Sequence, residues 1–133
     1  MVKGSCCCGK IKYEISGEIY GFKHCHCYTC RKITGTAYAS SAVTASAGFT
    51  ITEGKGELTG FLSSPGKTRN FCRNCGSQIY AIHDNDTSFV ILRVGTIDNF
   101  PSLPLEAHIW ISQKAPWYDI TGDAPKYLKG FPS

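Results

Sequence analysis

The chain has 133 residues, a formal net charge of +4 at pH 7 and eight cysteines. A chain of this length forms one hydrophobic core, which predicts a single domain over residues 1–133. No apolar run approaches the roughly 20 residues that a membrane span requires. Residues 1–10 also lack the apolar segment of a secretory signal. The sequence therefore predicts a cytoplasmic protein that does not bind membranes.

The positive charge does not predict nucleic-acid binding. The chain has no run of five or six like charges, and its densest basic pairs are Lys10 with Lys12 and Arg31 with Lys32, which are typical of solvated surface. Metal binding would also lower the charge, because zinc is ligated by deprotonated cysteine. Two zinc ions held by seven thiolates would bring the formal +4 down to about +1.

Short apolar-periodic runs separated by glycine-bearing breaks predict a mainly β fold of antiparallel strands. The clearest run is residues 10–16, where Ile11, Tyr13 and Ile15 fall on one face and charged residues on the other. This period of two is typical of a half-buried strand. Further strands are predicted, in chain order, over residues 37–43, 49–52, 56–62, 68–71, 77–84, 89–97 and 107–111.

Only residues 28–35 favour a helical turn, with Thr29 as its N-cap and Gly35 as its stop. The segment that begins at Pro101 is rich in proline, which cannot donate a hydrogen bond within a central strand. Apart from the predicted strand at 107–111, we expect this C-terminal segment to be loop that straps the surface.

The cysteines form three groups, at residues 6–8, 25–30 and 72–75. In a reducing compartment, clustered cysteines bind metal or carry out redox chemistry more often than they form structural disulfides. Within the first two groups the cysteines are also too close in sequence to bridge one another easily. The pattern therefore favours metal binding.

The most specific group is C-x-x-C followed by glycine at residues 72–76, which is typical of a zinc knuckle. The alternative, a thioredoxin-like redox pair, needs a strand-to-helix context that this segment does not provide. A structural zinc takes four ligands, so a second pair is required. Cys6 and Cys8 point to one side of an extended segment, which completes a predicted set with Cys72 and Cys75. Cys7 points away and is predicted to be a small buried hydrophobe.

Cys25, Cys27 and Cys30 remain, and three protein ligands are typical of a catalytic zinc. Two alternatives stay open. His24 or His26 would close the site as a fourth ligand, or two of these cysteines would pair with the knuckle and leave the first group free.

Three other side chains have less specific expectations. Arg31 follows the cysteine group and is interpreted as solvated, with binding of a thiolate or a substrate carboxylate as the alternative. His83 and His108 stand alone in the sequence and are interpreted as structural.

The chain resembles the glutathione-dependent formaldehyde-activating enzyme family, which includes centromere protein V. The resemblance covers nearly the whole chain and is carried by "GSCCCGKIKYEI", "CHCYTCRKITG", "FCRNCGSQIY", "VGTID" and "HIWISQKAPWYDITGDAPKYLKGF". It implies a single β-tent domain built around a structural zinc at Cys6, Cys8, Cys72 and Cys75. It implies a second, catalytic zinc at Cys25, Cys27 and Cys30. The family often has serine at the position of Tyr28.

The implied activity joins formaldehyde to the thiol of glutathione, giving S-hydroxymethylglutathione. The sequence thus predicts a zinc-dependent carbon–sulfur lyase whose partners are a glutathione-like thiol and an aldehyde, with Arg31 placed to orient a glutathione carboxylate. The alternative is a binding module in which both zinc sites are structural and the β surface recognises another protein. The coordination of the second zinc distinguishes the two hypotheses.

Overall fold

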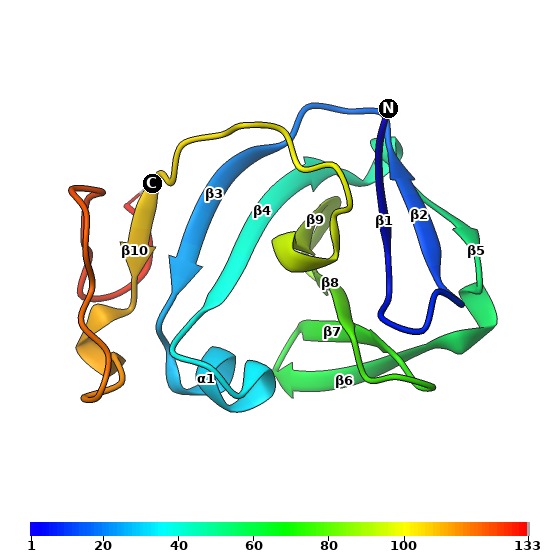
Figure 1. Cartoon of the computed structure of the whole chain (residues 1–133). Coiled ribbons are helices and arrows are strands. Elements are labelled where there is room, and N and C mark those ends of the chain that lie inside the picture. The colour runs from blue at the N-terminus through cyan, green and yellow to red at the C-terminus, as the bar shows by residue number, and fades with distance from the viewer. Residues whose placement is uncertain (133) are drawn as a thin grey trace. The chain divides into compact units, whose positions relative to one another are not determined.

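The structure is a computed structural model that describes residues 1–132, and it is mainly β (Figure 1). The chain divides into two compact units. The first comprises Met1–Tyr20 and Ala42–Ser102, and the second comprises Gly21–Ser41 and the chain from Leu103 onward. That the whole chain forms one domain stays a prediction. No helix within the described residues has the length and apolar character needed to cross a membrane.

The first unit contains a three-stranded antiparallel sheet in the order β1-β2-β5. Tyr13 and Ile15 of the central strand, and Ile11 directly before it, are each no more than 1% exposed, which confirms the predicted alternation. The Tyr13 ring lies over Gly4 of β1, where a Cβ atom would come within 2.0 Å of the ring. Glycine is therefore required at this close approach. The three strands are β1 (Val2–Ser5), β2 (Lys12–Ile15) and β5 (Phe49–Glu53).

Four more strands of this unit form an antiparallel series in the order β9-β8-β7-β6. Their buried side chains include Ile79, Ala81, Val90 and Leu92, which form the core of the unit. The series confirms the strands predicted between residues 56 and 93. The strands are β6 (Leu58–Ser64), β7 (Lys67–Cys72), β8 (Gln78–His83) and β9 (Asp86–Arg93). After Arg93 the chain turns into a short 3-10 helix, η3 (Val94–Thr96), so the predicted strand over 89–97 ends early.

The strand β3 (Tyr20–Cys25) lies in the second unit from Gly21 onward, and there it pairs in parallel with β10 (Ala107–Ile109). The expectation of purely antiparallel strands is therefore wrong at this pair. It matches His108 with His24 and Ile109 with Cys25, residues more than 80 positions apart. The unit also holds the helix α1 (Tyr28–Thr34) and the 3-10 helix η4 (Ile111–Gln113). Strand β4 (Ala39–Ala45) begins in this unit and ends in the first.

The sequence missed two strands. β1 contains a lysine and a glycine and shows no alternation of apolar residues. β3 is half-buried along most of its length, so it also lacks the period of two. Both strands form because their backbones pair with distant partners, which local sequence does not reveal. The strand predicted over 107–111 stops at Ile109, because Trp110 takes a left-handed conformation with φ of 57°.

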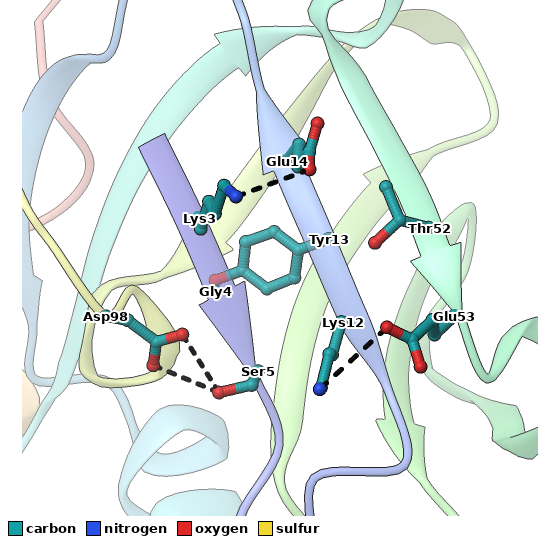
Figure 2. A pocket seen from close by; sticks show the side chains of 9 residues that line it. All are labelled: Lys3, Gly4, Ser5, Lys12, Tyr13, Glu14, Thr52, Glu53 and Asp98. Atoms are coloured by element: carbon teal, nitrogen blue, oxygen red, sulfur yellow. Dashed lines mark hydrogen bonds and ion pairs between the residues drawn. The ribbon is translucent and has the colours of Figure 1, made fainter. Parts of the chain in front are cut away.

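A hollow of about 480 Å³ lies on the β1-β2-β5 sheet (Figure 2). Its charged side chains pair with one another across the strands. The Lys3 and Glu14 side chains approach to 3.9 Å and those of Lys12 and Glu53 to 3.8 Å. The hydroxyl of Ser5 lies 3.0 Å from each carboxylate oxygen of Asp98. The charges of this hollow are therefore largely neutralised by their neighbours.

Candidate metal sites

The first site lies in the first unit, where four cysteine sulfurs lie within 4.8 Å of one another. The Sγ atoms of Cys6 and Cys8 are 3.5 Å apart, and those of Cys8 and Cys72 are 3.9 Å apart. A tetrahedral zinc with Zn–S bonds of about 2.3 Å separates its sulfurs by about 3.8 Å. The four sulfurs therefore match the donor type and the spacing of a zinc site, and they could hold a metal. The group consists of Cys6, Cys8, Cys72 and Cys75.

Two tight turns present these sulfurs. The amide of Gly9 donates to the carbonyl of Cys6 at 3.0 Å, and that of Gly76 donates to the carbonyl of Cys72 at 2.7 Å. Both glycines have positive φ, 79° and 82°, a conformation that other residues adopt only with strain. The glycine after each cysteine pair is thus required by the turn. The predicted extended conformation at residues 6–8 is wrong, because these residues form a turn.

Ser77 connects the two turns. Its hydroxyl accepts a hydrogen bond from the amide of Cys7 at 2.9 Å and lies 3.3 Å from the sulfur of Cys75. Hydrogen bonds from Ser77 lower the pKa of the Cys75 thiol. This favours the thiolate that metal ligation requires. Cys7 itself is exposed, so the prediction that it is buried is wrong: its side chain leaves the turn on the solvent side.

The second site lies in the second unit, where β3 ends and α1 begins. The sulfurs of Cys25, Cys27 and Cys30 lie within 4.8 Å of one another. Cys25 is the last residue of β3, and Cys30 is buried in α1. Among the described residues, the first group contains four sulfurs and the second contains three. No cysteine of residues 25–30 belongs to the group that contains Cys72 and Cys75.

Cys27 also caps α1. Its sulfur accepts a hydrogen bond from the amide of Cys30 at 3.4 Å, so the predicted cap at Thr29 is wrong. Cysteine takes the place of the usual serine or threonine because the same side chain faces the other two sulfurs. Gly35 ends the helix with φ of 68°, as predicted, and its amide donates to the carbonyl of Arg31.

The C-terminal segment holds this helix in place. The amide side-chain oxygen of Gln113 accepts a hydrogen bond from the backbone amide of Tyr28 at 2.9 Å. The Gln113 carbonyl accepts a second bond from the Arg31 guanidinium at 2.7 Å. Arg31 is only partly exposed, so its interpretation as a purely solvated side chain is wrong. Between the cysteines, the amide of His26 donates to the carbonyl of Ile109 at 2.9 Å.

Gln113→Ala should loosen the second site without unfolding the chain. The substitution removes the acceptor for the Tyr28 amide at the start of α1, and one such hydrogen bond contributes about 1 kcal/mol. Competition with a chelator should therefore show zinc held about fivefold less tightly at the weaker of the two sites. Gln113→Glu keeps an acceptor oxygen and is the matched control. Equal zinc affinities in the two variants would contradict this role.

Three histidines of the second unit form a cluster, in which His26 and His108 are buried and His24 is half-buried. His26 is fully buried, and its Nε2 lies 3.1 Å from Nδ1 of His108. His24 stacks on Tyr38 with 4.0 Å between ring centroids. Burial is the main cause that lowers the pKa of both His24 and His26 to about 4. His108 is therefore no lone residue, a fact that only the pairing of β10 with β3 reveals.

The histidines and the three sulfurs remain separate sets of donors. Among the described residues, the group of ligand atoms within 4.8 Å of one another contains no histidine nitrogen. His26 instead directs its Nε2 at another imidazole.

The chain is similar to two known proteins. A Schizosaccharomyces pombe protein named as an uncharacterized lyase is 25% identical over 118 residues, which cover 89% of this chain and 84% of that protein. A crystal structure of a Rhodobacter sphaeroides protein is similar to this chain with a TM-score of 0.64, and the match covers 75% of this chain and 91% of that protein's chain. At 20% identity, this second likeness shows a shared fold.

The chain also matches the model of a protein family. The model of the family described as glutathione-dependent formaldehyde-activating enzyme matches residues 1–113. The matched residues include both groups of sulfurs, the helix α1 and the Gln113 side chain that holds it. The chain therefore belongs to the glutathione-dependent formaldehyde-activating enzyme family.

Proposed function

We propose that the chain is a zinc-dependent carbon–sulfur lyase that acts on a thiol–aldehyde adduct such as S-hydroxymethylglutathione. Membership of the family supports a lyase-type enzyme that handles glutathione and formaldehyde. The observation that carries the proposal for this chain is the second group of sulfurs. Three cysteines converge there with no histidine nitrogen among the described donors, the donor number of a catalytic zinc.

The reaction requires one bond to break and one proton to move. In the direction of breakdown, the carbon–sulfur bond of the adduct is cleaved and its electron pair leaves with sulfur. The hydroxyl loses its proton as its oxygen becomes the carbonyl of formaldehyde, and the thiolate is protonated to glutathione. Any group that stabilises negative charge on sulfur therefore favours the leaving step.

Cys25, Cys27 and Cys30 would hold the second zinc, which can lower the pKa of a substrate thiol or polarise an aldehyde oxygen. Three thiolates would donate charge to a metal bound among them and weaken it as a Lewis acid, which favours the first role. The sulfurs are positioned by the end of β3, by the N-cap of α1 and by the hydrogen bond from the Tyr28 amide to the Gln113 side chain.

The first site would have a different task. Four thiolates at Cys6, Cys8, Cys72 and Cys75 complete a tetrahedral set, so a zinc bound there has no position left for substrate. We propose that this zinc is structural and that the first unit folds around it, as in a β-tent domain.

Exchange spectroscopy by NMR tests the proposed activity. Fully zinc-loaded protein should speed the interconversion of S-hydroxymethylglutathione with glutathione and formaldehyde beyond the uncatalysed rate, which is measured under the same buffer and pH. The reaction should return to that rate when the weaker-bound zinc is removed by a chelator. If loaded protein never exceeds the uncatalysed rate with any thiol tried, the lyase proposal is wrong and the protein-binding module becomes the better hypothesis.

A further inference from the structure

One strand of the first unit has an unpaired edge. Strand β6 stands last in the strand order and has β7 along one side (Figure 1). Among the described residues, no strand besides β7 pairs with it. A free edge presents a row of backbone N–H and C=O groups to any extended chain that reaches it. β6 can therefore accept one further strand.

The ladder between β6 and β7 shows which backbone groups face this edge. The amide of Arg73 donates to the carbonyl of Glu57 at 2.9 Å, so Glu57 forms its backbone bonds on the side of β7. In an antiparallel pair such positions alternate with positions whose N–H and C=O groups point away. The backbone groups of Leu58, Gly60 and Leu62 therefore point to the free edge. The register shifts after Leu62, which ends the regular part of the edge.

Two other strands have their outer sides covered by the chain itself. In the first unit, Gly4 of β1 bridges to Ile97. In the second unit, His108 of β10 bridges to Lys126. Natural free edges are commonly protected by a charged residue or a proline within the strand. β6 (Leu58–Ser64) is seven residues long and contains neither, so its edge is open to association.

The edge also carries apolar side chains that the chain leaves uncovered. Phe61 is 54% exposed and Leu62 is 61% exposed. Phe61 is the register partner of Arg69 on β7, which is the partner of Ala81 on β8. Arg69 and Ala81 are buried, at 3% and 0% exposure. This row of side chains is thus buried on β8 and β7 and reaches solvent at β6, where a further strand would cover it.

A second copy of β6 is complementary to this edge. Antiparallel pairing about a twofold axis at Phe61 places the two Phe61 rings opposite each other and Leu62 of each copy opposite Gly60 of the other. The outward backbone groups of Gly60 and Leu62 would then bond to each other. Gly60 leaves room for the leucine, and an aromatic pair across two strands is favourable. Residues 58–65 carry no charge, so the two copies meet without opposing like charges.

We propose that β6 is a homodimer interface, in which two copies of the chain join their sheets through antiparallel β6 strands centred on Phe61. The interface is twofold symmetric, so the same surface serves both chains. Backbone pairing supplies the affinity, and the opposed side chains fix the register. Because the interface is a single strand on each side, the dimer exchanges with the monomer and is favoured as concentration rises. The inference is independent of the proposed lyase function.

Sedimentation velocity of the full-length, zinc-loaded protein tests the interface. The measured mass should rise from that of one chain to that of two as the concentration increases. Leu62→Lys should keep the mass of one chain throughout, because it brings a charge into the edge of both copies. Leu128→Lys makes the same change at a leucine that is 68% exposed in the second unit, and this matched control should dimerise like the wild type. Hydrogen exchange of the Gly60 and Leu62 amides should slow as the dimer forms.

Opposite charges at position 61 test the register. Phe61→Lys and Phe61→Glu should each stay monomeric, because like charges would face each other across the axis, and a mixture of the two should dimerise. A mixture that stays monomeric, with both variants folded by circular dichroism, would overturn the pairing centred on Phe61. Wild-type protein with the mass of one chain at every concentration, or a dimer that persists in Leu62→Lys, would overturn β6 as the interface. Monomeric protein whose Gly60 and Leu62 amides are protected by an unrelated extended peptide would identify a peptide site in place of the dimer.

Discussion

Cys75→Ser should abolish the cooperative unfolding transition of the chain or leave it insoluble. Structural zinc binds zinc-finger peptides with about 10–16 kcal/mol, and this free energy is available only to the folded state. A small domain is stable by about 5–15 kcal/mol in total, so loss of one thiolate ligand removes a large share of it. Thermal unfolding followed by circular dichroism, with metal content measured on the same samples, gives the result.

Cys7→Ala is the control for that experiment. Cys7 lies next to two of the four ligands in the sequence, but its side chain is exposed and outside the group of sulfurs. Its replacement should therefore leave both the transition midpoint and the zinc content unchanged. A Cys75→Ser protein that unfolds at the wild-type midpoint would contradict a structural zinc at the first site.

Cys27→Ser should remove lyase activity down to the uncatalysed rate while the chain stays folded. Serine is a preferred N-cap, so its hydroxyl can keep the bond that the Cys27 sulfur accepts from the Cys30 amide. What the substitution removes is one thiolate of three. The variant should hold one zinc tightly and unfold within a few degrees of the wild type.

Cys27→Ala separates the two roles of this side chain. Alanine removes the thiolate and the cap together, so this variant should lose activity like Cys27→Ser and also about 1 kcal/mol of stability. Thr29→Ala, at the position where the sequence suggested a cap, should change neither quantity. Wild-type activity in Cys27→Ser, with the second zinc absent, would show that the reaction does not use this site.

Local patterns in the sequence were sufficient to predict most of the strands. The alternation at Ile11, Tyr13 and Ile15 predicted β2 because one face of that strand is buried. Strands β1 and β3 carry no such alternation and depend on pairing with distant partners. The parallel pairing of β10 with β3 joins residues over 80 positions apart, and no local pattern encodes it.

The two groups of sulfurs were predictable for a similar reason. Cysteines two or three residues apart meet in a single turn, so spacing brings the members of each pair together, and the glycines at 9 and 76 mark the two turns of the first site. That these two distant pairs join was predicted from the four ligands that a structural zinc takes. The supporting residues come from remote segments. Gln113 contacts Tyr28 from the C-terminal segment, which composition assigns to surface loop. His108 lies in a predicted strand, but it contacts His26 only because β10 pairs with β3. The prediction that Cys7 is buried was wrong, because residues 6–8 form a turn, and a turn exposes its middle residue.

The visible spectrum of cobalt-substituted protein tests the central claim most directly. With cobalt at both sites, added glutathione should increase the sulfur-to-metal charge-transfer absorption, because a fourth thiolate would join the three at Cys25, Cys27 and Cys30. Cys27→Ser should lose this response, while the absorption of the four-cysteine site persists. A spectrum that glutathione and smaller thiols leave unchanged, in protein shown to contain two cobalt ions per chain, would contradict a thiol-binding metal at the second site.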